Sequence, residues 1–175
     1  MSQSGGGPVV SRPPRGPSAA GKAYLIAYNF AMAVLWGGLL FVVVQQVFNG
    51  ASPQEITAAA APFARVPQWA AALEVLHACV GLVPSSPVMA LMQWGGKAHA
   101  MFTILYGVAE AQTSWLGPVL LAVWAVSEVI RYPWYALSTA GACPAWLTWL
   151  RYSMFLPLYP LGVVCEMGLG AYCQL

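Results

Sequence analysis

The chain has 175 residues, of which 59% are hydrophobic and only 7% are charged, and its formal net charge is +2. A typical soluble domain is about 45–50% apolar and about 25% charged. Seven basic and five acidic side chains cannot cover the surface of a soluble fold of this length. The composition therefore excludes a soluble globular enzyme, a disordered chain and a nucleic-acid-binding protein, and it indicates a lipid bilayer as the surrounding medium.

The first 22 residues differ from the rest of the chain. They are rich in Gly, Pro and Ser and include three cations, which predicts a disordered tail. No apolar stretch precedes a small-residue cleavage site, so this segment does not have the pattern of a cleaved signal peptide. We expect residues 23–175 to form one membrane-embedded domain.

Five apolar segments follow the tail, and we expect each to cross the membrane. The first lies within residues 23–54, carries no charge and contains about 25 apolar, small or aromatic residues, enough to span a hydrocarbon core of about 30 Å. The other four lie at residues 69–83, 88–108, 114–130 and 145–175.

The connections between these segments are predicted to be irregular. Pro53, Pro62 and Pro67 predict a loop between the first two segments, and the aromatic, turn-rich residues 131–144 are expected at the membrane interface. Only helices or closed barrels satisfy the backbone in lipid, and no segment shows the strict alternation of a barrel strand. The predicted fold class is therefore all-α, a polytopic membrane helix bundle with about five spans.

Short-loop cations indicate the orientation of the bundle, because they tend to remain on the cytosolic side. Arg12, Arg15 and Lys22 precede the first span and favour a cytosolic N-terminus. The linker that carries Arg131 then lies on the same side, whereas Arg65 lies on the opposite side.

Charged groups inside membrane segments are costly and mark functional positions by default. Glu74 and His77 are three residues apart and share a helix face, either as a packed polar pair or as a proton relay. Glu128 and Arg131 have the same spacing and predict a structural ion pair. Lys97 is expected to extend its ammonium group towards the interface.

The last segment combines a phenol, a carboxyl group and two prolines. Tyr159 and Glu166 are seven residues apart, or two helical turns, and so lie on one face. Pro157 and Pro160 each remove an amide donor, and with Gly162 they predict a broken helix. The phenol and carboxyl group are candidate acid and base; the alternative is an interfacial tyrosine and a helix-end glutamate.

Other sites of common enzymes have no sequence support. The chain contains no HExxH, P-loop, GxSxG or Rossmann pattern, so metalloprotease, nucleotide-binding and serine-hydrolase functions are not indicated. We expect no cofactor and no metal. The cysteines lack C-x-x-C spacing and are predicted to be buried thiols rather than a disulfide framework: Cys79, Cys143, Cys165 and Cys173.

Four segments, in this order, carry a resemblance to a known family: YNFAMAVLW, LEVLHACVGLVPSS, WAVSEVIRYPWYAL and RYSMFLPLYPLGVVCE. Its most specific part is E-x-x-RY-x-x-Y followed by LYP-x-GV-x-x-E. The chain resembles the 3-hydroxyacyl-CoA dehydratases of very-long-chain fatty-acid elongation, the protein-tyrosine-phosphatase-like family, over most of residues 24–170. This resemblance implies a multi-pass protein of the endoplasmic-reticulum membrane with six spans, of which the sixth is missing from this sequence.

The resemblance also implies an activity, the dehydration of (3R)-3-hydroxyacyl-CoA to trans-2-enoyl-CoA in the third step of elongation. Its catalytic pair would be Tyr159 and Glu166, without an assignment of acid and base. The implied partners are a long-chain 3-hydroxyacyl-CoA, the lipid bilayer and other elongation enzymes. Four residues are candidate supporting side chains: Glu74, His77, Glu128 and Arg131. The alternatives are an inactive scaffold in the elongase assembly and a small transporter that uses Glu74 and His77 as a proton path.

Two further expectations concern access and chemistry. The phosphatase loop H-C-x-x-G-x-x-R is not preserved, because Ala78 replaces its nucleophile and Pro84 its arginine, so no phosphatase activity is expected. An acyl-CoA that arrives from the cytosol must also reach Glu166, far along a helix that enters from that side. Such access requires a cavity or a re-entrant kink.

Overall fold

The computed structural model of the chain describes residues 16–172, so the predicted disorder of residues 1–15 lies outside the described residues. The secondary-structure elements of the described part are all helices, with no strand among them, which confirms the all-α class. Its helices are α1 (Ala19–Phe48), α2 (Pro53–Ala70), α3 (Ala72–Cys79), α4 (Pro87–Ala98), the π-helix η1 (His99–Leu105), α5 (Ala109–Thr113), α6 (Leu116–Ala140) and α7 (Ala145–Ala171).

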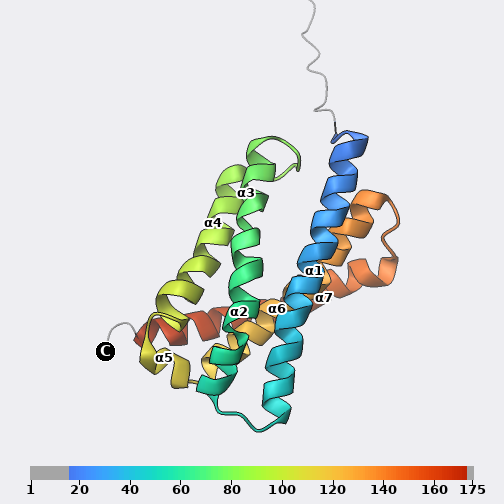
Figure 1. Cartoon of the computed structure of the whole chain (residues 1–175). Helices are drawn as coiled ribbons and strands as arrows, with labels where there is room; N and C mark the ends of the chain where they lie inside the picture. The colour runs from blue at the N-terminus through green and yellow to red at the C-terminus, as the bar shows by residue number, and fades with distance from the viewer. Residues whose placement is uncertain (1–15, 173–175) are drawn as a thin grey trace, which may run out of the picture.

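Successive helices run back and forth through the bundle (Figure 1). Helix α1 runs from the N-terminal end to the opposite end, and α2 with α3 returns. Helix α4 continues into η1, α6 returns, and α7 runs back across the bundle. By length and composition, three helices in the described part are suited to cross a membrane on their own: α1, α6 and α7.

Helix α1 begins earlier than the sequence predicted. The Ser18 hydroxyl caps it by accepting a hydrogen bond of 3.2 Å from the Gly21 amide. A serine at this position satisfies one of the amide groups left free at a helix start. The helix therefore includes residues 19–22, which the sequence had assigned to the tail.

The loop predicted between the first two spans is instead helix α2. Ser52 and Glu55 form a capping box, in which each side chain accepts a hydrogen bond from the other residue's backbone amide. Pro53 occupies the first turn, where its missing amide costs nothing, and Pro62 and Pro67 lie inside the helix. The predicted second span is thus the end of a longer pass.

Helix α6 also extends further than expected. It continues through Pro133 to Ala140 and ends at Gly141, whose φ of 72° is the left-handed conformation that glycine adopts without strain. The Ala142 amide then donates to the Leu137 carbonyl at 2.9 Å, which closes the helix end. The predicted interfacial turn is therefore confined to residues 141–144.

The predicted break in the last span is wrong. Helix α7 is continuous from Ala145 to Ala171, with Pro157 and Pro160 inside it. Both prolines are exposed on the bundle surface. Proline is tolerated inside membrane helices when the freed carbonyls find other partners or small local adjustments.

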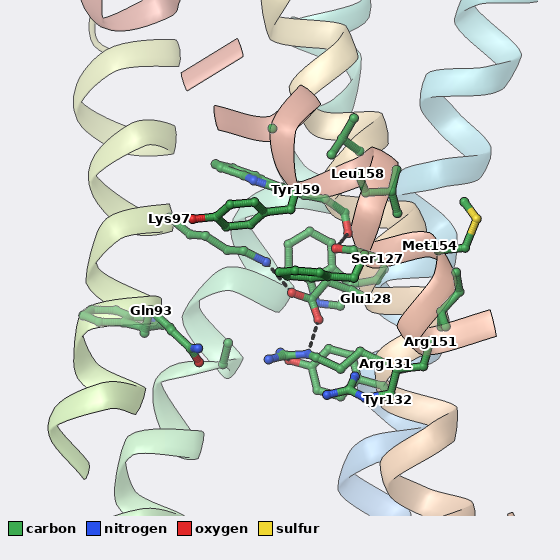
Figure 2. Close-up of a pocket in the computed structure, with 18 of the residues that line it drawn as sticks. Gln93, Lys97, Ser127, Glu128, Arg131, Tyr132, Arg151, Met154, Leu158 and Tyr159 are labelled. Atoms are coloured by element: carbon green, nitrogen blue, oxygen red, sulfur yellow. Dashed lines mark hydrogen bonds and ion pairs between the residues drawn. The ribbon is translucent and has the colours of Figure 1, made fainter. Parts of the chain in front are cut away.

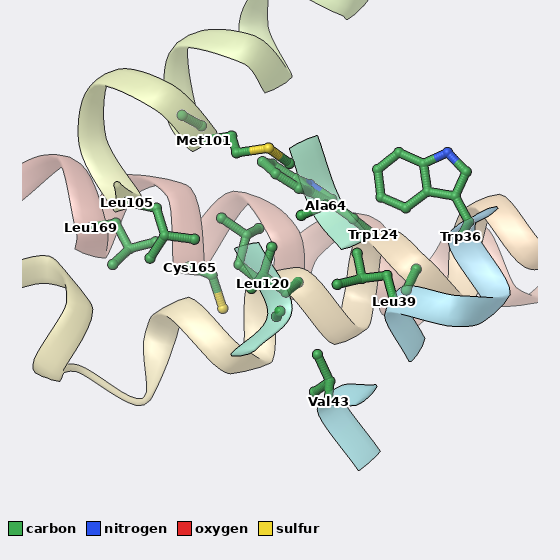
Figure 3. Close-up of a cluster of buried hydrophobic side chains, with 14 of the residues drawn as sticks. Trp36, Leu39, Val43, Ala64, Met101, Leu105, Leu120, Trp124, Cys165 and Leu169 are labelled. Atoms are coloured by element: carbon green, nitrogen blue, oxygen red, sulfur yellow. The ribbon is translucent and has the colours of Figure 1, made fainter. Parts of the chain in front are cut away.

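The core forms where α1, α2 and α6 meet η1 and α7 (Figure 3). The buried side chains that line this contact include Trp36, Leu39, Leu120, Trp124 and Cys165. The prediction of buried thiols holds for Cys165 but is wrong for the exposed Cys79 and the half-buried Cys143. All three are free, and Cys173 lies outside the described residues.

Candidate active site

Tyr159 and Glu166 line the same cavity, which has a volume of about 560 Å³. Helices α6 and α7 form one side of the cavity, and residues of α2, α3 and α4 form the other (Figure 2). The shared face predicted from their spacing is therefore confirmed. Because α7 is continuous between them, seven residues place their Cα atoms about 10.5 Å apart along the helix axis.

Tyr159 and Glu166 differ in their contacts with the rest of the protein. The Trp124 indole nitrogen donates a hydrogen bond of 3.2 Å to Glu166 Oε1, and Trp124 itself is only 4% exposed. Tyr159 stacks on Phe155 with ring centroids 5.0 Å apart, and its side chain is 60% exposed. The carboxyl group is thus fixed by the core, whereas the phenol lies at the open side of the cavity.

A cluster of four charged side chains joins the two sides of the cavity, with Glu128 and Arg131 on α6, Lys97 on α4 and Glu74 on α3. Glu128 is 3% exposed and contacts both Lys97 and Arg131, the latter with a distance of 2.5 Å between Arg131 Nε and Glu128 Oε2. Arg131 also pairs with Glu74 at 3.2 Å. Two cations and two carboxylates therefore balance in a region where an unpaired charge would be costly.

The predicted ion pair between Glu128 and Arg131 is confirmed, but the expectation for Lys97 is wrong. Lys97 does not extend to the interface; it turns inward onto Glu128, and its ammonium group lies 5.6 Å from the ring centres of both Trp36 and Trp124. A buried carboxylate and two aromatic faces stabilise a lysine better than a lipid environment does.

Glu74 and His77 do not form the predicted pair. Glu74 accepts hydrogen bonds from Arg131 and from the Tyr132 hydroxyl, whereas His77 Nε2 lies 2.8 Å from the Tyr24 hydroxyl. Only Glu74 lines the cavity of Tyr159 and Glu166. Of the six candidate site residues, five therefore meet at one cavity and His77 does not.

A second cavity, of about 760 Å³, adjoins the first. Glu74, Gln93, Arg131 and Tyr135 line both, and His77 lines only the second. Sequence reasoning missed this cavity and two side chains of the first, Lys97 and Trp124. An intramembrane lysine that needs a carboxylate partner was the available signal, but the partner lies 31 residues away.

The described residues provide no constellation for metal or thiol chemistry. Within residues 16–172, no three His, Cys, Asp or Glu side chains are grouped so that they could hold a metal ion. Cys79, the thiol nearest to the phosphatase-like string, is exposed and lines neither cavity described above. The polar groups that line the first cavity include the Tyr159 phenol, the Glu166 carboxyl group and the charged side chains of Lys97, Glu128 and Arg131.

Comparison with known families decides the relationship. Residues 68–172 match the family described as protein tyrosine phosphatase-like protein, PTPLA. The chain belongs to this family. The matched region contains α3 to α7 in full and therefore every residue of the charged cluster, Tyr159 and Glu166.

Several curated proteins are similar over most of the chain. Very-long-chain (3R)-3-hydroxyacyl-CoA dehydratase PASTICCINO 2A of Oryza sativa is 36% identical over 153 residues, which cover 87% of this chain and 69% of the relative. The dehydratase hpo-8 of Caenorhabditis elegans is 37% identical over 83% of this chain and 67% of the relative. Dehydratase 2 of Mus musculus is 30% identical over 89% of this chain and 61% of the relative. No solved structure matches the chain.

Proposed function

We propose that this protein dehydrates very-long-chain (3R)-3-hydroxyacyl-CoA to trans-2-enoyl-CoA, and that Tyr159 and Glu166 carry the reaction. The observation that carries this proposal is the shared cavity, in which a phenol and a carboxyl group face the same space. The PTPLA relatives named as dehydratases of this substrate support it. The reaction is a hydro-lyase step and needs no cofactor.

Dehydration requires two proton transfers at adjacent carbons of the acyl chain. A base removes the C2 proton, the C2–H electrons form the double bond, and the C3–O bond breaks as an acid protonates the departing hydroxyl to give water. The Trp124 N–H can only donate, so Glu166 Oε1 is the acceptor of this hydrogen bond. The other carboxyl oxygen of Glu166 remains available. This arrangement supports Glu166 as the base and Tyr159 as the donor to the hydroxyl group.

The charged cluster serves this site by positioning. Glu128 of α6 pairs with Lys97 of α4 and with Arg131 of α6, and Lys97 lies against the ring of Trp124, whose indole N–H donates to Glu166. We assign Glu74, Glu128 and Arg131 to this supporting role. His77 is placed instead at the second cavity.

The setting of the reaction is also part of the proposal. The exposed apolar side chains of α1 and α7, such as Phe41, Leu156 and Met167, suit contact with a lipid bilayer. We place the protein in the endoplasmic-reticulum membrane with a cytosolic N-terminal end, beside the other enzymes of the elongation cycle. The transporter alternative relied on a proton path through Glu74 and His77. It has no support from their contacts, because Glu74 accepts from Arg131 whereas His77 contacts Tyr24.

Conversion by the purified protein tests the proposed function. The chain in detergent is incubated with a long-chain (3R)-3-hydroxyacyl-CoA, and the trans-2-enoyl product is followed by chromatography and mass spectrometry. The matched control is the Tyr159→Phe, Glu166→Gln double variant at equal folded concentration. Product formation by the parent and not by the control supports the enzyme; no product from either supports the inactive scaffold.

A further inference from the structure

The second cavity opens at one end of the bundle. Its lining includes Pro17 and Lys22 at the start of α1, residues 82–85 of the loop between α3 and α4, and Ser138 and Thr139 at the end of α6. These three segments lie at the same end of the molecule (Figure 1). Loops and helix ends at the limit of the apolar passes place the cavity mouth where water meets the membrane.

The second cavity shares part of its lining with the candidate active site. Glu74 and Arg131, which are 3.2 Å apart, line both cavities, as do Gln93 and Tyr135. A ligand that spans the two cavities has one end among the loops and its other end beside Tyr159 and Glu166. The shared residues mark the middle of this path.

Two cations, Lys22 at the mouth of the second cavity and Arg151 in the first cavity, have no carboxylate partner among the described residues. Lys97 and Arg131 are balanced by carboxylates, whereas no described carboxylate forms an ion pair with Lys22 or Arg151. Arg151 lies 4.5 Å from the Trp134 ring centre, and its guanidinium donates a hydrogen bond of 3.3 Å to the Tyr135 hydroxyl. Both aromatic residues line the second cavity, whereas Arg151 itself lines the first, so its guanidinium lies where the two cavities adjoin.

The lining offers neutral hydrogen-bond donors beside these cations. Ser85, Ser138 and Thr139 each present a hydroxyl group, and the indole of Trp134 presents a flat aromatic face. Cations, hydroxyl groups and an aromatic face match a ligand that combines phosphate groups with a planar base. The first cavity differs, because the α7 side contributes apolar residues such as Phe155, Leu158 and Val163.

We propose that the second cavity binds the phosphorylated end of the acyl-CoA, with Lys22 and Arg151 contacting its phosphate groups. The thioester passes Glu74 and Arg131 and places the 3-hydroxyl carbon at Tyr159 and Glu166. This inference rests on the proposed dehydratase function. It also explains how a substrate that enters from the N-terminal end reaches a carboxyl group deep in α7.

A phosphate-free substrate separates this binding site from the chemistry. The kcat/KM is measured for a long-chain (3R)-3-hydroxyacyl-CoA and for the same acyl group on N-acetylcysteamine, which lacks the phosphates. The ratio compared is kcat/KM for the CoA ester divided by kcat/KM for the N-acetylcysteamine ester. In each of the variants Lys22→Gln and Arg151→Gln, this ratio should fall roughly threefold to tenfold, because the KM for the CoA ester rises. Arg65→Gln is the matched control, because Arg65 lies over the Tyr106 ring and lines neither cavity.

Two further measurements complete the test. In the parent, higher ionic strength should raise the KM of the CoA ester and leave that of the N-acetylcysteamine ester unchanged. Arg151→Lys should restore part of the ratio, because it keeps the charge but not the planar contact. An unchanged ratio in both variants, or a salt effect equal for both esters, overturns the binding site. Turnover of neither ester by the parent overturns the proposed function instead.

Discussion

Trp124 and Trp36 offer a matched pair of buried residues at the site. Both rings lie 5.6 Å from the Lys97 ammonium group, but only Trp124 donates to Glu166; the Trp36 indole nitrogen has no hydrogen-bond partner in the described structure. Trp124 is therefore a positioning residue for the proposed base. Its hydrogen bond, and not its bulk, distinguishes it from Trp36.

Replacing each tryptophan by phenylalanine tests this difference. A hydrogen bond to a charged group contributes about 1.5–3 kcal/mol, so Trp124→Phe should lower turnover roughly 10- to 100-fold at equal folded concentration. Trp36→Phe should leave turnover within about twofold, although it loses similar packing. Equal losses in the two variants would show that Trp124 acts only through the core.

The residues of the phosphatase-like loop predict the absence of phosphatase activity. Ala78 stands at the nucleophile position and Pro84 at the arginine position, and Cys79 lies outside both cavities. No hydrolysis of a phosphotyrosine peptide is expected. Release of phosphate that disappears in Cys79→Ser would contradict this expectation.

At the scale of elements, one buried carboxylate ties three helices together. Glu128 of α6 contacts Lys97 of α4, and Arg131 of α6 extends the cluster to Glu74 of α3. Removing one partner of a buried pair typically costs about 3–5 kcal/mol, because the remaining charge is left uncompensated. Glu128→Gln should therefore lower the thermal midpoint in detergent before it affects chemistry.

The control for Glu128→Gln is Glu110→Gln, because Glu110 is exposed on the short helix α5 and its side chain forms no ion pair in the described residues. This control should keep the parental midpoint. A Glu128→Gln protein with a parental midpoint but no turnover would instead place Glu128 in the catalytic step.

The helices show which local signals predict structure. The long apolar segments located α1, α6 and α7, because their composition alone requires burial in lipid. Helix α2 was missed because Pro62 and Pro67 indicate a loop, although Ser52 and Glu55 carry the capping-box spacing. Proline removes one amide donor; whether the helix then breaks depends on tertiary packing, which the local pattern does not contain.

The candidate site also combines features that a local pattern predicts with features that depend on helix packing. The seven-residue spacing of Tyr159 and Glu166 is local, and it correctly placed both on one helix face; that this face lines a cavity is a finding of the structure. The contacts of Lys97 with Glu128 and of Trp124 with Glu166 join residues 31 and 42 positions apart. Such pairs depend on how helices pack, so a single sequence indicates only that each charged group needs some partner.

At the scale of the whole molecule, the proposed orientation places the mouth of the second cavity in the cytosol. Cys79 is exposed at the end of α3, on the same end of the bundle as the start of α1 (Figure 1). In sealed microsomes, a membrane-impermeant maleimide should label Cys79 when Cys143, Cys165 and Cys173 are replaced by alanine.

The matched control for this labelling moves the cysteine to the opposite end. Asn49→Cys, in a chain with no other cysteine, lies in the turn after α1 and should react only after the membrane is permeabilised. Labelling of the Asn49→Cys chain in sealed microsomes, with Cys79 protected, would reverse the orientation.

The most direct test of the account is turnover of a long-chain (3R)-3-hydroxyacyl-CoA by four proteins at equal folded concentration. These are the parent, Tyr159→Phe, Glu166→Gln and the double variant. General acid–base groups contribute about 10²–10⁴ in rate, so each single change should lower turnover by that factor, with thermal midpoints near the parent. Because the two residues act as one unit, the double variant should lose far less than the product of the single losses. Near-parental turnover in both single variants would contradict the assignment of Tyr159 and Glu166 as the catalytic pair.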